Sequence, residues 1–148
     1  MRSLIKSSKT LLILTAFFAV SFAFAGSAYS QSVPTVTVKA NKKSFNGGET
    51  GTLTISFKPA KNVKIPKEPE ITVTSINGVE GAGMQDYSAG GGDYLSSNKV
   101  KYNFTVPSGL ASGTTVKISG TVKFGYCNSD DGVCKIAKKD FSTTIKIK

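Results

Sequence analysis

The chain's two cysteines, Cys127 and Cys134, are its main candidates for chemistry. Two thiols at this spacing can form a disulfide, and a partner's thiolate can exchange a disulfide that it can reach. The 148-residue chain has no histidine, which excludes a Ser-His-Asp triad, a Cys-His pair and a histidine metal site. Two cysteines are also too few for a four-thiolate zinc or iron–sulfur site. The cysteine pair is therefore the candidate site, and we expect no metal and no cofactor.

The start of the chain has the three-part layout of a secretory signal peptide. Three basic residues lie within positions 2–9, and the uncharged, mostly apolar stretch 11–24 follows. That stretch is shorter than the roughly 20 residues of a membrane-spanning helix. Small residues then allow cleavage after Ala25 or after Ser30, and we favour the second site slightly. Residues 1–30 are therefore predicted to be a cleavable signal peptide.

Export determines the redox environment of the remaining domain, residues 31–148. This domain has no second apolar stretch of membrane length, so we expect no membrane span in the mature chain. We expect it to be exported to the periplasm or, alternatively, to the extracellular space. Both compartments are oxidising, which favours a disulfide between Cys127 and Cys134.

Apolar and polar residues alternate along most of the mature chain, which is typical of half-buried strands. The alternating stretches lie near residues 35–39, 52–57, 71–74, 99–106, 116–126 and 141–148. Turn-forming residues separate them, and no stretch has the 3.6-residue apolar period of a helix. The pattern predicts an all-β fold, an immunoglobulin-like antiparallel β-sandwich of about seven strands.

Positive charge alone could suggest a nucleic-acid partner. The formal net charge is +10, and +7 remains after the three basic residues of 1–30 are removed. Several lysines instead alternate with apolar residues along the expected strands. That arrangement is typical of a solvated sheet face that discourages edge pairing. No aromatic residues are interleaved with a basic patch, so we expect no nucleic-acid partner.

The segment 78–98 departs from the alternating pattern. It contains six glycines, three of them consecutive at positions 90–92. Long irregular segments in compact domains are often functional or disordered. One interpretation is a mobile flap near a binding surface; the other, which we favour, is a loose crossover that carries one short edge strand.

The residues around the cysteines predict a hairpin. A strong strand leads to Cys127, a turn-forming Asn-Ser-Asp-Asp-Gly sequence follows, and a weaker strand leads away from Cys134. Even-numbered positions of the incoming strand are apolar, so the odd-numbered Cys127 is expected to point away from the core. Cys134 is also expected to point outward if no bulge intervenes, although Ile136 breaks the phase of its strand. We therefore expect both sulfurs at the mouth of the hairpin, facing solvent or a shallow flap-covered groove.

The energetics leave two roles for the disulfide open. Closing an eight-residue loop stabilises a fold by only about 2.5 kcal/mol. The bond can therefore be a staple that pins a hairpin in a secreted domain, or an exchangeable redox pair. In the first case the chain is a non-enzymatic β-sandwich module for binding or adhesion.

The second half of the chain resembles the N-terminal, immunoglobulin-like periplasmic domain of the DsbD family of thiol:disulfide interchange proteins. The resemblance rests on a sheet-forming segment, an aromatic residue and Cys127, then a short polar loop, Val133-Cys134 and a final strand. It implies that Cys127 and Cys134 are a redox pair that passes electrons to thioredoxin-fold oxidoreductases. It also implies that Cys134 is the cysteine that enters the mixed disulfide. The expected partner is a thioredoxin-fold redox protein or a DsbD-like membrane protein, and the chain is then one component of a thiol:disulfide oxidoreductase system.

Overall fold

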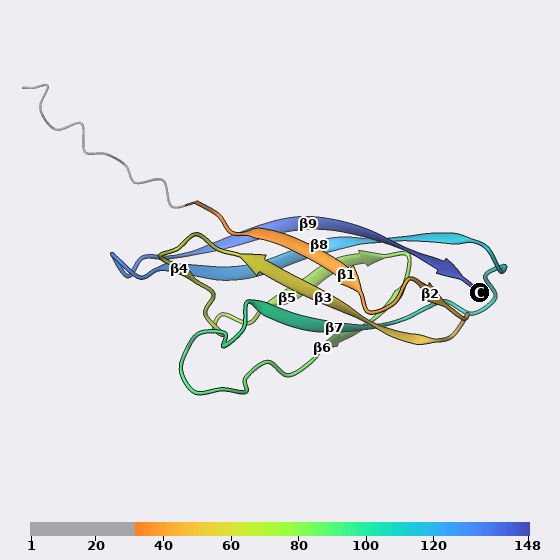
Figure 1. Cartoon of the computed structure of the whole chain (residues 1–148), viewed down its shortest axis with the longest axis horizontal. Coiled ribbons are helices and arrows are strands. Elements are labelled where there is room, and N and C mark those ends of the chain that lie inside the picture. The colour runs from red at the N-terminus through yellow and green to blue at the C-terminus, as the bar shows by residue number, and fades with distance from the viewer. Residues whose placement is uncertain (1–31) are drawn as a thin grey trace, which may run out of the picture. The chain divides into compact units, whose positions relative to one another are not determined.

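The computed structural model describes residues 32–148, which form nine strands and no helix (Figure 1). The predicted signal peptide, residues 1–30, lies outside the described residues. The strands are β1 (Thr35–Ala40), β2 (Ser44–Phe45), β3 (Thr50–Lys58), β4 (Val63–Lys64), β5 (Thr72–Asn77), β6 (Glu80–Met84), β7 (Lys99–Thr105), β8 (Thr115–Asn128) and β9 (Cys134–Ile147). The predicted all-β fold class is confirmed.

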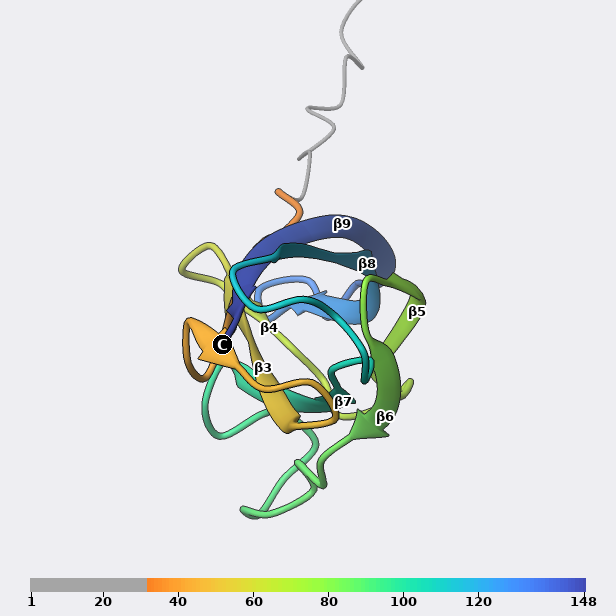
Figure 2. The same ribbon diagram turned by 90° about the vertical axis from the view of Figure 1, so that its right-hand side faces the viewer.

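The strands form two sheets that face each other, as the end-on view of Figure 2 shows. One sheet has the order β1-β3-β7-β6, and all of its neighbours are antiparallel. The other has the order β2-β9-β8-β4, and β5 also pairs with β8. In this second sheet β2 runs parallel to β9, and the other pairs are antiparallel.

The nine strands occupy the seven positions of a constant-type immunoglobulin sandwich. β1 and β2 together fill the first position, because the chain moves from one sheet to the other between them. β4 and β5 together fill the third position, since both pair with β8. The sheets then contain positions 1-2-5-4 and 3-6-7, which is the immunoglobulin arrangement. The predicted sandwich of about seven strands is therefore confirmed.

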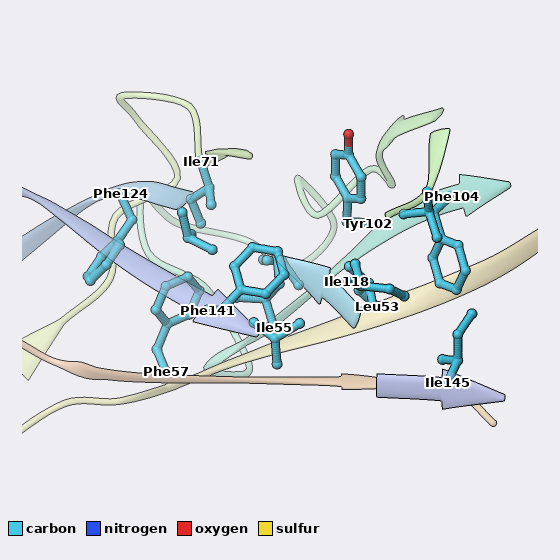
Figure 3. Packing of buried hydrophobic residues seen from close by; sticks show 14 of the residues in the cluster. Leu53, Ile55, Phe57, Ile71, Tyr102, Phe104, Ile118, Phe124, Phe141 and Ile145 are labelled. Atoms are coloured by element: carbon cyan, nitrogen blue, oxygen red, sulfur yellow. The ribbon is translucent and has the colours of Figure 1, made fainter. Parts of the chain in front are cut away.

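The hydrophobic core lies between the two sheets (Figure 3). It is built from the apolar phase of each strand, and no polar or charged side chain of residues 32–148 is buried. Aromatic rings bridge the sheets: Phe45 packs edge-on against Phe104 with ring centroids 5.4 Å apart, and Phe57 lies 4.8 Å from Phe124. Such contacts make the sandwich a rigid support for its loops and hairpins.

The glycine-rich segment 78–98 contains one short edge strand, β6, which pairs with β7. This is the strand of the favoured interpretation, but the rest of the segment is not loose. The backbone N–H of Lys67 donates to the carbonyl of Asp93 at 2.8 Å, and the N–H of Leu95 donates to the carbonyl of Ile65 at 2.9 Å. Backbone hydrogen bonds therefore hold the segment against the chain that follows β4.

Tyr87 anchors this segment from within. Its hydroxyl oxygen accepts a hydrogen bond from the backbone N–H of Ile71 at 2.8 Å, and Ile71 is fully buried. Burial raises the pKa of the Tyr87 phenol, and the hydrogen bond from Ile71 acts in the opposite direction. The hydroxyl thus provides a buried backbone donor with its acceptor.

Replacing Tyr87 by phenylalanine is expected to lower the free energy of unfolding by about 1–2 kcal/mol, because the Ile71 N–H loses its acceptor in a buried site. Urea-induced unfolding measures this change. Tyr94→Phe is the matched control, since the Tyr94 ring is 40% exposed, and should change stability by less than about 0.5 kcal/mol. Equal stabilities for the two variants would contradict the anchoring role of the Tyr87 hydroxyl.

Candidate functional site

The long hairpin of β8 and β9 carries both cysteines at its tip. Its thirteen residue pairs keep one register, from Thr115 opposite Lys146 to Cys127 opposite Cys134. A disulfide joins the two cysteines, whose Cα atoms are 4.0 Å apart. Residues directly opposite each other in an antiparallel pair are close enough for such a bond. The expected disulfide and its expected position across the neck of the hairpin are both confirmed.

Hydrogen bonds hold the loop between the cysteines in place. Gly132 has a φ of +69°, a conformation that glycine adopts readily, and its N–H donates to the carbonyl of Asn128 at 2.9 Å. The loop is also tied to the chain before β4, since the Ser129 N–H donates to the carbonyl of Asn62 at 2.8 Å. The Asn62 side chain in turn donates to the carboxylate of Asp130. The tip of the hairpin is thus ordered by contacts other than the disulfide.

The two sulfurs differ in their access to solvent. Cys134 is exposed, whereas Cys127 is only 4% exposed. The difference arises because β8 is flanked on both sides at this point: Cys127 lies between Cys134 and Lys64 of β4. Two residues away on the same face, a Cβ on Gly125 would lie 3.0 Å from Pro66. The chain that follows β4 therefore covers β8 here and leaves the edge strand β9 open.

Strand parity predicted the orientation of the cysteines correctly and the exposure of one of them wrongly. The register has no bulge, and Ala137 opposite Phe124 belongs to the core face. Ile136 lies on the other face and is 57% exposed, so it follows the outward phase of Cys134. Cys127 shares this outer face and is absent from the core cluster, but covering residues keep it from solvent.

Exposed apolar side chains lie close to Cys134 along the chain. Val133 precedes Cys134 and is 45% exposed, and Ile136 follows it by two positions. Tyr94, which is also partly exposed, lies beneath the Lys64 ammonium, whose Nζ is 5.4 Å from the ring centroid. In the sequence, the local sign of this surface was an apolar residue, Ile136, at a position that strand alternation turns outward. No local pattern connects Lys64 with the cysteines, because strand pairing brings them together.

Charges of both signs lie near the disulfide. Lys64 is directly opposite Cys127, and a nearby positive charge favours a thiolate. Asp130 and Asp131 lie in the loop, and their negative charges disfavour a thiolate. The Asp131 carboxylate accepts a hydrogen bond from the Val133 N–H at 2.9 Å, so it is held within the turn.

Other kinds of site receive no support from the described part of the chain. Residues 32–148 contain no group of three or more potential metal-ligating side chains. No helix in this part of the chain is long and apolar enough to cross a membrane. Two surface hollows, of about 250 and 380 Å³, flank Tyr87, and neither is lined by Cys127 or Cys134.

Comparisons with known proteins identify no family for this chain. No protein-family model matches it, and no curated protein is significantly similar in sequence. A solved structure with some similarity is a D312A form of BcpA, the major pilin subunit of Bacillus cereus. The two share 14% sequence identity with a TM-score of 0.33. The match covers 78% of this chain and 40% of the pilin subunit.

Proposed function

We propose that the chain is an exported, periplasmic thiol:disulfide interchange domain that passes electrons between its cysteine pair and a thioredoxin-fold partner. The partner can be a thioredoxin-fold redox protein or a DsbD-like membrane protein. One observation carries the proposal: the disulfide lies at the tip of a hairpin, outside the core, with Cys134 exposed and Cys127 covered. Exchange needs one sulfur that a partner can reach, and a fully buried bond would be inert.

The exposures of the two cysteines support different roles for them in the proposed exchange. A partner thiolate attacks the Sγ of Cys134, and the bond to Cys127 breaks, so that Cys127 leaves as a thiolate and takes a proton from solvent. The partner and Cys134 are then joined in a mixed disulfide. The partner's second thiol loses its proton and attacks the partner's own sulfur, which releases Cys134 as a thiol. In sum, the partner dithiol is oxidised and the Cys127–Cys134 disulfide is reduced by two electrons and two protons.

An exchangeable bond also requires that the fold survive its reduction. The hairpin has thirteen residue pairs, and its loop is held by hydrogen bonds to Asn62. The disulfide adds only about 2.5 kcal/mol by loop-closure entropy. The tip therefore keeps most of its support in the reduced form, which favours redox exchange over the alternative of an adhesion or binding module with a structural staple.

The reduction potential of the pair tests the proposed function. Structural disulfides have potentials below about −300 mV, and exchangeable ones have higher potentials. Equilibration with a thiol redox buffer, followed by alkylation of free thiols, should give a value clearly above that limit. A variant with both cysteines replaced by serine provides the baseline. A potential well below −300 mV would refute the redox function and support the staple.

A further inference from the structure

The outer edge of β9 is open beside the exposed cysteine. β2 pairs with β9 only at Lys146 and Ile147, and no other described strand pairs with that edge. Figure 1 shows the tip of the β8–β9 hairpin extending beyond the start of β1. Residues 134–138 therefore form an edge whose backbone is available to another chain.

The register shows which backbone groups this edge presents. In an antiparallel pair, positions alternate between those that exchange hydrogen bonds with each other and those whose backbone groups point away. The Asn128 N–H donates to the Val133 carbonyl at 2.9 Å, which makes theirs a hydrogen-bonded pair. The next pair, Cys127 and Cys134, is then non-hydrogen-bonded, so the N–H and C=O of Cys134 point to the open edge.

The same parity holds along the strand. Ile136, opposite Gly125, also presents its N–H and C=O to the open edge. At the far end, Lys146 has the same parity, and its N–H donates outward to the Lys43 carbonyl at 2.9 Å. Cys134 and Ile136 thus offer two consecutive positions for pairing with an added strand, with exposed apolar side chains beside them.

We propose that this edge is the docking site for an extended segment of the redox partner, which adds to β9 as a strand and pairs with the backbone of Cys134 and Ile136. The proposal rests on the proposed function, since the added segment brings the partner's cysteine to the Sγ of Cys134. Addition of a strand to an open sheet edge is a general mode of peptide recognition. The exposed side chains of Val133 and Ile136 favour an apolar segment.

Charge argues against a second copy of this chain as the occupant. Antiparallel pairing of two β9 edges would bring Lys135, Lys138 and Lys139 close to the same residues of the other copy. Like charges across a strand pair destabilise it. The lysines thus discourage self-pairing, while the short stretch from Cys134 to Ile136 remains open to a segment of another protein.

Proline at position 136 tests the docking edge. Ile136→Pro removes an N–H that does not pair with β8, and proline is tolerated at such edge positions. We expect reduction of the disulfide by reduced bacterial thioredoxin to slow about tenfold, because the partner's carbonyl loses its donor. Reduction by dithiothreitol should be unchanged. Ile136→Thr, which keeps the N–H and loses only apolar surface, should slow the thioredoxin reaction less.

Lys138→Pro is the matched control, because it removes the next outward N–H along the same edge, beyond the two positions proposed to pair with the partner. This variant should react with thioredoxin as the wild type does. Unchanged kinetics in Ile136→Pro, or equal slowing in Lys138→Pro, would overturn the docking edge alone. Slower reduction of Ile136→Pro by dithiothreitol would also overturn the docking edge, since the substitution would then act on the disulfide itself. If thioredoxin reduces the wild type no faster than dithiothreitol at equal thiol concentration, the proposed redox function fails instead.

Hydrogen exchange provides a second test that does not depend on proline. A mixed disulfide is formed by displacing thionitrobenzoate from Cys134 of the labelled Cys127→Ser variant with a thioredoxin that lacks its second cysteine. In it, the amides of Cys134 and Ile136 should become at least about tenfold more protected than in the free variant. The amide of Lys138 is the internal reference. Unchanged protection at Cys134 and Ile136 would contradict strand addition even if the exchange reaction itself proceeds.

Discussion

Cys127→Ser is expected to leave a highly reactive thiol at Cys134, whereas Cys134→Ser should leave a thiol that reacts slowly. The reason is exposure: Cys134 lies open on the edge strand, and Cys127 is only 4% exposed beneath the chain that follows β4. A reagent reaches a covered thiol only when the structure opens locally. Ellman's reagent, added under native conditions, should react with Cys134 at least about a hundredfold faster than with Cys127.

The two serine variants are controls for each other. Both lose the disulfide, and both should lose about 2.5 kcal/mol of stability, so a difference in reactivity reports position and not unfolding. Ellman's reagent leaves thionitrobenzoate on the thiol it labels, and the thiolate of a thioredoxin that lacks its second cysteine can displace that group and form a mixed disulfide. Labelled Cys127→Ser should accumulate this stable mixed disulfide, and Cys134→Ser should not. Equal rates and equal yields for the two variants would show that the sulfurs do not have separate roles.

Gly51→Ala is expected to destabilise the fold by about 3 kcal/mol, which is large for the addition of one methyl group. A Cβ at this position would lie 2.3 Å from the ring of Phe104 and 2.6 Å from the ring of Phe45. Both rings are fully buried and pack edge-on against each other, so neither can move without opening the core. Thermal and urea-induced unfolding measure the loss.

A second substitution makes this prediction specific. Phe104→Leu replaces the ring that the new methyl group would strike by a smaller side chain. The double variant should therefore be at least about 1 kcal/mol more stable than the sum of the single effects predicts. Gly47→Ala is the control, because a Cβ there meets only ordinary contacts at 3.5 Å, and its effect should stay below about 1 kcal/mol. Additive effects of Gly51→Ala and Phe104→Leu would contradict steric crowding as the cause.

The fold class followed from local patterns in the sequence. Alternation with a period of two shows which face of a strand meets the core, as in β3, where Leu53, Ile55 and Phe57 are buried. β7 follows the same rule, whereas β8 is buried on both faces from Phe124 to Cys127. The same rule placed Cys127 and Cys134 across a hairpin and on its outer face. These features depend on neighbours along the chain, so a single sequence can reveal them.

Some features depended on chain segments that no local pattern connects. The first strand divides between two sheets as β1 and β2, and the segment 78–98 bonds to the chain after β4. The covering of Cys127 has the same origin, because Lys64 and Pro66 reach β8 only when the sandwich closes. Parity determines the direction of a side chain but not what lies above it.

The sequence by itself thus determined the sandwich, the disulfide and the outward orientation of both sulfurs. Only the tertiary structure decided that Cys134 is open and Cys127 is covered, and that the edge of β9 beside Cys134 has no partner strand among the described residues. The physical reason is that orientation follows from backbone alternation within one strand. Exposure and edge pairing follow instead from which distant segments pack beside that strand, and this depends on the closure of the whole core.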